Sequence, residues 1–252
     1  MSTATNPSHE MIKLYAKILR TPTLTEYHEI IRQLEPGESY EAFLINLMKR
    51  EVLKRQENQI TRKIKMAKFP FTKTLDEFDF ERMENVSSAC IWELSSCDYI
   101  KKRENIIMIG NPGSGKSHLS IGLGMKACQA GMNVRFYTAA SLVNELSESL
   151  QNNRLSKLEK SLSKVDLLIL DELSYLTFNR HQSELLFQVI SERSERGSII
   201  VTTNLEFSRW TELFENDIMI AALIDRLTFH SHILDMNVKD SYRLLETAKH
   251  II

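Results

Sequence analysis

The chain has 252 residues, of which 42% are hydrophobic, and its formal net charge is −1. It contains no apolar stretch near the roughly 20 residues that span a bilayer, and residues 1–9 lack the basic and apolar regions of a secretion signal. Its three cysteines, Cys90, Cys97 and Cys128, form no CxxC pair, which argues against zinc and for free thiols in a reducing compartment. We therefore expect a soluble, cytoplasmic protein with no membrane partner.

The first 68 residues have a helical pattern and an excess of basic residues. Short helices are predicted over residues 11–20 and 25–34, with a Thr-Pro-Thr turn between them and Pro36-Gly37 after the second. Residues 1–68 carry 12 Lys or Arg against 8 Asp or Glu, although the whole chain is slightly acidic. We expect a small all-helical amino-terminal domain over residues 1–68.

The basic excess is concentrated in residues 49–68. The spacing of apolar and basic residues in this stretch predicts a helix with two faces. One face is an apolar arc of Leu53, Ile60, Ile64 and Ala67, which is expected to pack against another element. The other, called the cationic stripe below, consists of Arg50, Lys54, Arg55, Arg62, Lys65 and Lys68. A charge run of this kind is commonly a solvated helix face. The functional alternative is a line of contacts to nucleic-acid phosphates, since binding without sequence preference needs little besides Lys and Arg.

After a junction at Phe69-Pro70-Phe71, residues 69–252 predict an α/β domain. Strands are expected at residues 105–109, 133–137, 165–170, 198–203 and 232–236. Helical patterns separate them, which is typical of a five-stranded, mostly parallel sheet with flanking helices. A helical insertion over residues 141–163 lies between the second and third strands. Its exposed basic residues are possible DNA contacts or a solvated surface: Arg154, Lys157, Lys160 and Lys164.

Residues 110–117 read Gly-Asn-Pro-Gly-Ser-Gly-Lys-Ser, a complete phosphate-binding loop. An apolar run precedes the loop and a helical pattern follows it, which is the strand, loop and helix order that the chemistry requires. Backbone N–H groups and the positive end of the helix then attract the β-phosphate, Lys116 reaches the β- and γ-phosphates, and Ser117 binds Mg²⁺. The predicted nucleotide-binding residues are Gly110, Asn111, Pro112, Gly113, Ser114, Gly115, Lys116, Ser117 and His118.

Two later strands end in polar residues, at the sheet edge where ligands bind in open α/β folds. The run Val-Asp-Leu-Leu-Ile-Leu over residues 165–170 is followed by Asp171, expected to help hold Mg²⁺, and Glu172, expected to be the base that polarises an attacking water. Glu172 has an alternative role as the cap of a turn. Asn204, after the next strand, is expected to hold the attacking water or contact the γ-phosphate, unless it is an ordinary turn asparagine.

Several segments together carry a family resemblance. The loop at residues 110–118, the strand at 165–173, and Val-Thr-Thr-Asn-Leu-Glu-Phe at 201–207 followed by Trp210 resemble the AAA+ ATPases of the IstB/DnaC group. Three further segments are similar to IstB proteins, the ATP-binding helpers of insertion-sequence transposases. These are residues 67–80, Asp-Arg-Leu at 225–227, and Ser-Tyr-Arg-Leu at 241–244.

The resemblance implies a mechanism and partners. AAA+ proteins hydrolyse ATP with Mg²⁺ at subunit interfaces, and Arg226 matches the arginine that completes the neighbouring subunit's site. Arg243 matches the group's nucleotide-sensing arginine, although the usual helical lid after it is reduced or absent. IstB relatives bind and deform double-stranded DNA as homo-oligomers and assist a transposase, so these partners are expected here.

Two other functions share parts of this pattern. A DnaC-like replicative helicase loader has the same ATPase core, but a loader is expected to carry a helicase-docking segment, whereas the head of this chain resembles the IstB type. A small-molecule kinase with a phosphate-binding loop belongs to a different class. It requires an acceptor pocket and a lid, and it has no use for Glu172 placed to activate water.

Overall fold

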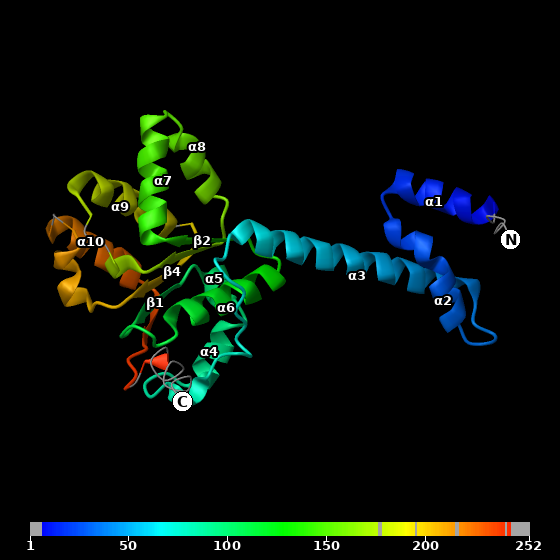
Figure 1. Ribbon diagram of the computed structural model, residues 1–252, viewed down its shortest axis with the longest axis horizontal. Helices are drawn as coiled ribbons and strands as arrows, with labels where there is room; N and C mark the ends of the chain where they lie inside the picture. The colour runs from blue at the N-terminus through cyan, green and yellow to red at the C-terminus, as the bar shows by residue number, and fades with distance from the viewer. Residues whose placement is uncertain (1–6, 176–177, 195, 215–216, 240, 243–252) are drawn as a thin grey trace, which may run out of the picture. The chain divides into compact units, whose positions relative to one another are not determined.

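The computed structural model describes residues 7–175, 178–194, 196–214, 217–239 and 241–242 (Figure 1). The chain divides into two compact units, Met1–Arg62 and Lys63–Ile252. The boundary between the units falls within the long helix α3 (Tyr40–Ala67).

The first unit is helical in its described part, as the sequence predicts. It contains α1 (Pro7–Leu19), a 3₁₀ turn η1 (Pro22–Glu26), α2 (Tyr27–Gln33) and most of α3. Ala16, Ile30 and Leu47 are buried here, beside the carboxylate of Glu51, which accepts hydrogen bonds from Thr23. This core is small for a unit of this length.

The predicted apolar arc of α3 is buried only toward its carboxyl end. Ala67 is fully buried and Ile64 packs with it against the core of the second unit, in which both residues lie. Leu53, by contrast, is 50% exposed. The expectation that the whole arc packs is therefore wrong for Leu53, because a helical pattern shows that residues share a face and not that another element covers it.

The second unit is built on a five-stranded sheet in the order β2-β3-β4-β1-β5. The strands are β1 (Asn105–Ile109), β2 (Val134–Thr138), β3 (Leu167–Asp171), β4 (Ser198–Thr203) and β5 (Ser231–Asp235). Every strand pairing is parallel. The predicted strands and the parallel sheet are thus confirmed, and the carboxyl ends of all five strands lie at one edge.

Helices cover both faces of the sheet (Figure 1). One face carries α7 (Ala139–Gln151), α8 (Leu155–Leu162), α9 (Arg180–Ser194) and α10 (Asp217–Thr228). The other carries α4 (Ser88–Leu94), α5 (Asp98–Lys102) and α6 (Lys116–Gln129). Side chains of β3 alternate between the two layers, with Leu168 and Leu170 in the first core and Leu167 and Ile169 in the second. Burial on both faces explains the unbroken apolar run of this strand.

Three short 3₁₀ segments connect these elements: η2 (Phe80–Arg82), η3 (Leu173–Tyr175) and η4 (Phe207–Glu212). No helix within the described ranges is long and apolar enough to cross a membrane.

A buried arginine fixes the loop between α8 and β3. Arg193 is 3% exposed and donates from Nη1 to the carbonyl oxygens of Leu162 and Val165, at 3.0 and 2.5 Å. Its Nη2 donates to the carbonyl oxygens of Asp166 and Ser198, at 3.2 and 3.1 Å. Burial lowers the pKa of this guanidinium to about 10. One side chain thus joins the end of α8 to the starts of β3 and β4.

We expect Arg193→Met to lower the free energy of unfolding by about 3 kcal/mol, because four buried carbonyl groups lose a charged donor while the aliphatic volume is kept. Urea denaturation measures this change. Arg196→Met, at an exposed neighbouring position, is the control and should stay within about 0.5 kcal/mol of the wild type. Equal stability of the two variants would contradict the structural role of Arg193.

Candidate nucleotide-binding site

The phosphate-binding loop connects β1 to α6, and its geometry requires glycine. Gly113 and Gly115 have φ angles of +79° and +90°, which side chains disfavour. A Cβ atom on Gly115 would lie 2.7 Å from the ring of Phe78, and one on Gly110 would lie 2.5 Å from the carbonyl oxygen of Met236. The loop is therefore enclosed by a segment that precedes the sheet and by another that follows β5.

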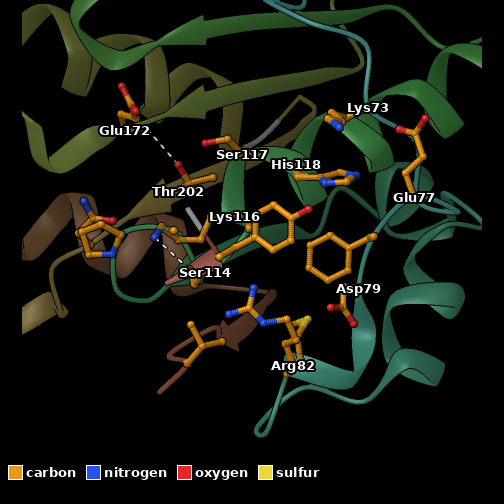
Figure 2. Close-up of a pocket in the computed structure, with 18 of the residues that line it drawn as sticks. Lys73, Glu77, Asp79, Arg82, Ser114, Lys116, Ser117, His118, Glu172 and Thr202 are labelled. Atoms are coloured by element: carbon orange, nitrogen blue, oxygen red, sulfur yellow. Dashed lines mark hydrogen bonds between the residues drawn. The ribbon is translucent and has the colours of Figure 1, made fainter. Parts of the chain in front are cut away.

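Lys116 begins α6, so that the positive end of the helix faces the loop. Its side chain is buried, and Nζ donates to the carbonyl oxygens of Gly110 at 2.7 Å and Asn111 at 2.9 Å, and to Oγ of Ser114 at 3.3 Å (Figure 2). These bonds hold the ammonium group against the loop that the sequence assigns to phosphates. Phosphate oxygens are stronger acceptors for a charged donor than neutral carbonyls.

One carboxylate joins the three segments of the predicted catalytic edge. Oδ1 of Asp171 accepts hydrogen bonds from Oγ of Ser117, at 3.0 Å, and from Oγ1 of Thr202. Thr202 Oγ1 in turn accepts a bond from the backbone N–H of Glu172, at 2.9 Å (Figure 2). Asp171 is 4% exposed and Glu172 has a φ of +59°. The hydrogen bond that the Glu172 N–H donates to Thr202 holds this uncommon backbone conformation.

The structure brings three of the four predicted catalytic residues to one cavity. Lys116, Glu172 and Asn204 all line it. Asn204 is fixed through its backbone N–H, which donates to Oγ of Ser174 at 2.9 Å. The sequence missed Thr202, because a threonine within a strand is an ordinary β-forming residue and only the pairing of β3 with β4 places its hydroxyl beside Asp171.

Two groups of the site fit a magnesium ion. The hydroxyl of Ser117 and the carboxylate of Asp171 are oxygen donors, which Mg²⁺ prefers, and they lie 3.0 Å apart. Nowhere in the described ranges do three or more His, Cys, Asp or Glu side chains gather as a metal site. A protein that supplies few ligands suits Mg²⁺, which is usually held together with substrate phosphates and water.

The cavity above the loop has a volume of about 520 Å³, within the range typical of small-ligand sites. Besides the loop, the cavity is lined by apolar and aromatic side chains from the segment before β1 and from the segment after β5: Phe71, Phe78, Met83, Val238 and Tyr242. Such side chains suit the base of a nucleotide whose phosphates lie on the loop. The sequence did not single them out, since isolated aromatic residues carry no motif.

His118 contacts the segment before the sheet. Its Nε2 lies 2.7 Å from the carbonyl oxygen of Thr74, and its ring packs edge-on against Phe78 at a centroid distance of 5.2 Å. The His118 ring thereby fixes Phe78, which contacts the loop at Gly115. His118 lines the cavity, as predicted for a nucleotide-binding residue, and its hydrogen bond is to protein.

The side chain of Asn111 attaches the segment after β5 to the loop. Asn111 Nδ2 donates to the carbonyl oxygen of Val238 at 2.6 Å, and the Val238 N–H donates back to Asn111 Oδ1 at 3.2 Å. The backbone N–H of Asn111 also donates to Oδ1 of Asn237, at 3.0 Å. Farther along, the Tyr242 N–H donates to the carbonyl oxygen of Gly113 at 3.2 Å. Asn237, Val238 and Tyr242 thus lie along the phosphate-binding loop.

The segments before the sheet and after β5 also contact each other. Arg82 lies over the Tyr242 ring, 5.3 Å from its centroid. Lys239 and Glu84 form an ion pair at 2.9 Å, and Asn85 Nδ2 donates to Oδ2 of Asp235 at 2.7 Å. The two segments are thus joined beside the cavity that both of them line.

Arg226 does not reach the cavity of its own chain. It lies on α10, where Nη1 donates to the carbonyl oxygen of Ala222 at 3.1 Å and the guanidinium lies 5.0 Å from the centroid of the Phe187 ring. It is not among the described residues that line the cavity. This location is compatible with a role in a neighbouring subunit. Arg243, the other arginine predicted for this site, lies outside the described residues.

The residues predicted to bind DNA lie in two places. Arg50, Lys54, Arg55, Arg62, Lys65 and Lys68 lie on or directly after α3. Arg154 and Lys157 lie at the start of α8, where both are exposed. Their binding role stays a prediction.

The sequence matches the family described as IstB-like ATP binding protein over residues 16–250. The chain belongs to this family. It is 36% identical to an ATP-binding protein of insertion sequence IS5376 from Geobacillus stearothermophilus, over 94% of this chain and 95% of that protein. It is 35% identical to the corresponding IS21 protein of Pseudomonas aeruginosa, over 96% of this chain and 91% of that one. The resemblance to IstB proteins is thus confirmed.

Solved structures of two AAA+ proteins share the fold of this IstB-like chain. The DnaC helicase loader matches with a TM-score of 0.52 and 23% identity, over 69% of this chain and 100% of that one. DnaA from Aquifex aeolicus, bound to the ATP analogue AMPPCP, matches with a TM-score of 0.58 and 17% identity, over 73% and 57%. The predicted AAA+ fold is confirmed.

We expect Asn111→Ala to weaken ATP binding about fivefold, because about 1 kcal/mol of hydrogen bonding between the loop and Val238 is lost. Titration with a fluorescent ATP analogue measures the affinity. Hydrogen exchange at the Val238 amide should also become faster, because its acceptor is removed. Asn152→Ala, at an exposed position on the end of α7, is the control. Unchanged exchange at Val238 would contradict this attachment.

Proposed function

We propose that this IstB-like protein is an ATPase that works at subunit interfaces and assists a transposase on double-stranded DNA. The observation that carries the ATPase assignment is the hydrogen-bonded chain from Ser117 through Asp171 and Thr202 to the backbone of Glu172. It links the phosphate-binding helix to the carboxylate that follows β3. A nucleotide-binding protein without hydrolysis does not require this link.

Each residue then has a defined task. Lys116 exchanges its carbonyl acceptors for the β- and γ-phosphates and neutralises their charge. Ser117 and Asp171 hold Mg²⁺, which neutralises developing charge on the phosphates when it is bound. Glu172 orients the attacking water and accepts its proton, with Asn204 fixing the water from the end of β4. The base is held by the apolar and aromatic side chains that line the cavity, Phe71, Phe78, Met83, Val238 and Tyr242.

Assembly completes the proposed site. Since Arg226 lies away from the cavity of its own chain, we propose that it acts on the γ-phosphate held by the neighbouring subunit. Its guanidinium then leaves the Phe187 ring. A cation supplied across an interface makes hydrolysis depend on assembly.

The DNA and transposase assignments rest on the family and on surface charge. The two relatives described above are ATP-binding proteins of insertion sequences. We propose that residues 1–68 form a domain that binds DNA or a partner protein, and that residues 69–252 form the ATPase domain. The cationic stripe and the exposed residues Arg154 and Lys157 are the proposed DNA contacts.

We expect Glu172→Gln to bind ATP with wild-type affinity and to lose most hydrolysis, because an amide cannot accept the proton of the attacking water. Lys116→Ala should instead lose nucleotide binding, because its charged donor to the phosphates is removed. Phosphate release and binding of a fluorescent ATP analogue measure the two effects separately. Wild-type turnover by Glu172→Gln would show that another group is the base.

We expect Arg226→Ala to retain ATP binding and to lose about 10³-fold in hydrolysis, as is typical where such an arginine is removed. Mixing tests whether it acts across the interface. Arg226→Ala and Glu172→Gln proteins, each inactive alone, should regain activity together, because a mixed interface has one intact Glu172 and one intact Arg226. No recovery after proven co-assembly would contradict an interface role.

A further inference from the structure

A second, larger cavity lies within the unit Lys63–Ile252, on the edge of the sheet formed by β2. It is a groove with a volume of about 1040 Å³, between the carboxyl end of α3, the start of β2 and the helix α8. Six of its lining residues are cations, and none of its lining residues is acidic: Lys63, Arg135, Arg154, Lys157, Lys160 and Lys164. Segments that are far apart in the sequence thus build one basic groove.

The groove cations keep their charge unneutralised. Across the described part of the chain, none of the six forms an ion pair with a carboxylate. Lys63 donates to the neutral Oδ1 of Asn133 at 2.9 Å, and Arg135 donates to the carbonyl oxygen of Met66 at 3.0 Å. These bonds fix the two side chains and leave their positive charges for a ligand.

The cationic stripe differs in this respect. Half of its residues are paired with acids: Arg50 with Glu26 and Glu29, Lys54 with Glu57, and Arg55 with Glu51. The hydrogen bond and charge of Arg50 lower the pKa of the Glu29 carboxyl. A ligand phosphate has to compete with these carboxylates for the same cations. In the groove it meets no such competition.

We propose that the groove holds the phosphate backbone of a DNA duplex and makes the larger share of this protein's contacts to it. The inference rests on the proposed function and assigns its DNA site to Lys63, Arg135 and the basic side chains of α8. Asn153 and Ser156 also line the groove and are suited to donate hydrogen bonds to phosphate oxygens.

The lining favours a duplex over a single strand. Proteins that hold single strands stack the bases on aromatic side chains, and the residues that line this groove include no aromatic one. A duplex keeps its bases stacked inside and presents two lines of phosphates, for which cations alone are sufficient. The groove also has an apolar part of its lining, which makes no specific contact with DNA in this assignment: Met66, Val134, Leu162 and Val165.

The groove is separate from the nucleotide site. It lies at the starts of β2 and β3, whereas the phosphate-binding loop and Asp171 lie at the carboxyl ends of the strands. The two cavities share no lining residue. Substitutions in the groove should therefore alter DNA binding and leave ATP binding intact.

The test compares three triple variants that each remove three positive charges from the full chain. The groove variant is Lys157→Ala, Lys160→Ala and Lys164→Ala. The stripe variant is Lys54→Ala, Arg62→Ala and Lys65→Ala. The control is Lys17→Ala, Lys102→Ala and Arg196→Ala, at exposed positions outside both surfaces. Binding of a 50-base-pair duplex and of a single strand of equal length is measured by fluorescence anisotropy with a non-hydrolysable ATP analogue, over a series of salt concentrations.

For the groove variant we expect the slope of log affinity against log salt to decrease by up to about 2.7 per bound protomer, because each lost phosphate contact contributes about 0.9. The stripe variant should lose less of the slope, and the control should keep the wild-type slope. Affinity for the fluorescent ATP analogue should be the same in all proteins, which shows that the groove variant is folded.

Three results would overturn the groove assignment. The assignment is wrong if the groove variant binds the duplex as the wild type does. It is also wrong if the stripe variant loses as much of the salt slope as the groove variant, or more. If the wild-type protein binds the single strand more tightly than the duplex, and the groove variant loses this binding, the groove holds a single strand and not a duplex. If the wild-type protein binds neither DNA, the proposed function itself is refuted. This outcome is distinct from failure of the groove assignment, because it is observed before any residue is substituted.

Discussion

The carboxylate of Asp171 is the constraint on which the nucleotide site depends. It is almost fully buried, and a buried carboxylate is stable only when donors satisfy it. Ser117 and Thr202 are two such donors, and they come from the phosphate-binding helix and from the adjacent strand. Satisfying one charge therefore sets the distance between loop and sheet, and through Thr202 it also sets the backbone of Glu172.

The parallel sheet makes this arrangement possible. Because β3 and β4 pair in parallel, Asp171 and Thr202 emerge at the same edge, although thirty-one residues separate them in the sequence. The apolar layers on both faces hold the strands in this register. Val238 and Tyr242 then form hydrogen bonds to Asn111 and Gly113, which attach the segment after β5 to the phosphate-binding loop.

Charge on the surface of this protein is informative only together with its partners. The cationic stripe and the basic groove have six cations each. Three of the six in the stripe are paired with carboxylates, those of Glu26, Glu29, Glu51 and Glu57. Exposed ion pairs contribute little to stability, but they still reduce the positive potential that a phosphate meets. This distinction, and not the number of lysines, separates the groove from the stripe.

The sequence by itself determined the phosphate-binding loop, the five strands and the carboxylates after β3, because these depend on local order and on periodicity along the chain. It also gave the family, through motifs that stand at fixed spacing. Only the tertiary structure decided the role of Thr202, the attachment of Asn237 and Val238 to Asn111, and the convergence of Lys63 and Arg135 with α8. These contacts join segments whose separation in sequence carries no signal. Which acids neutralise which cations is likewise a matter of distance in space, and therefore of the fold.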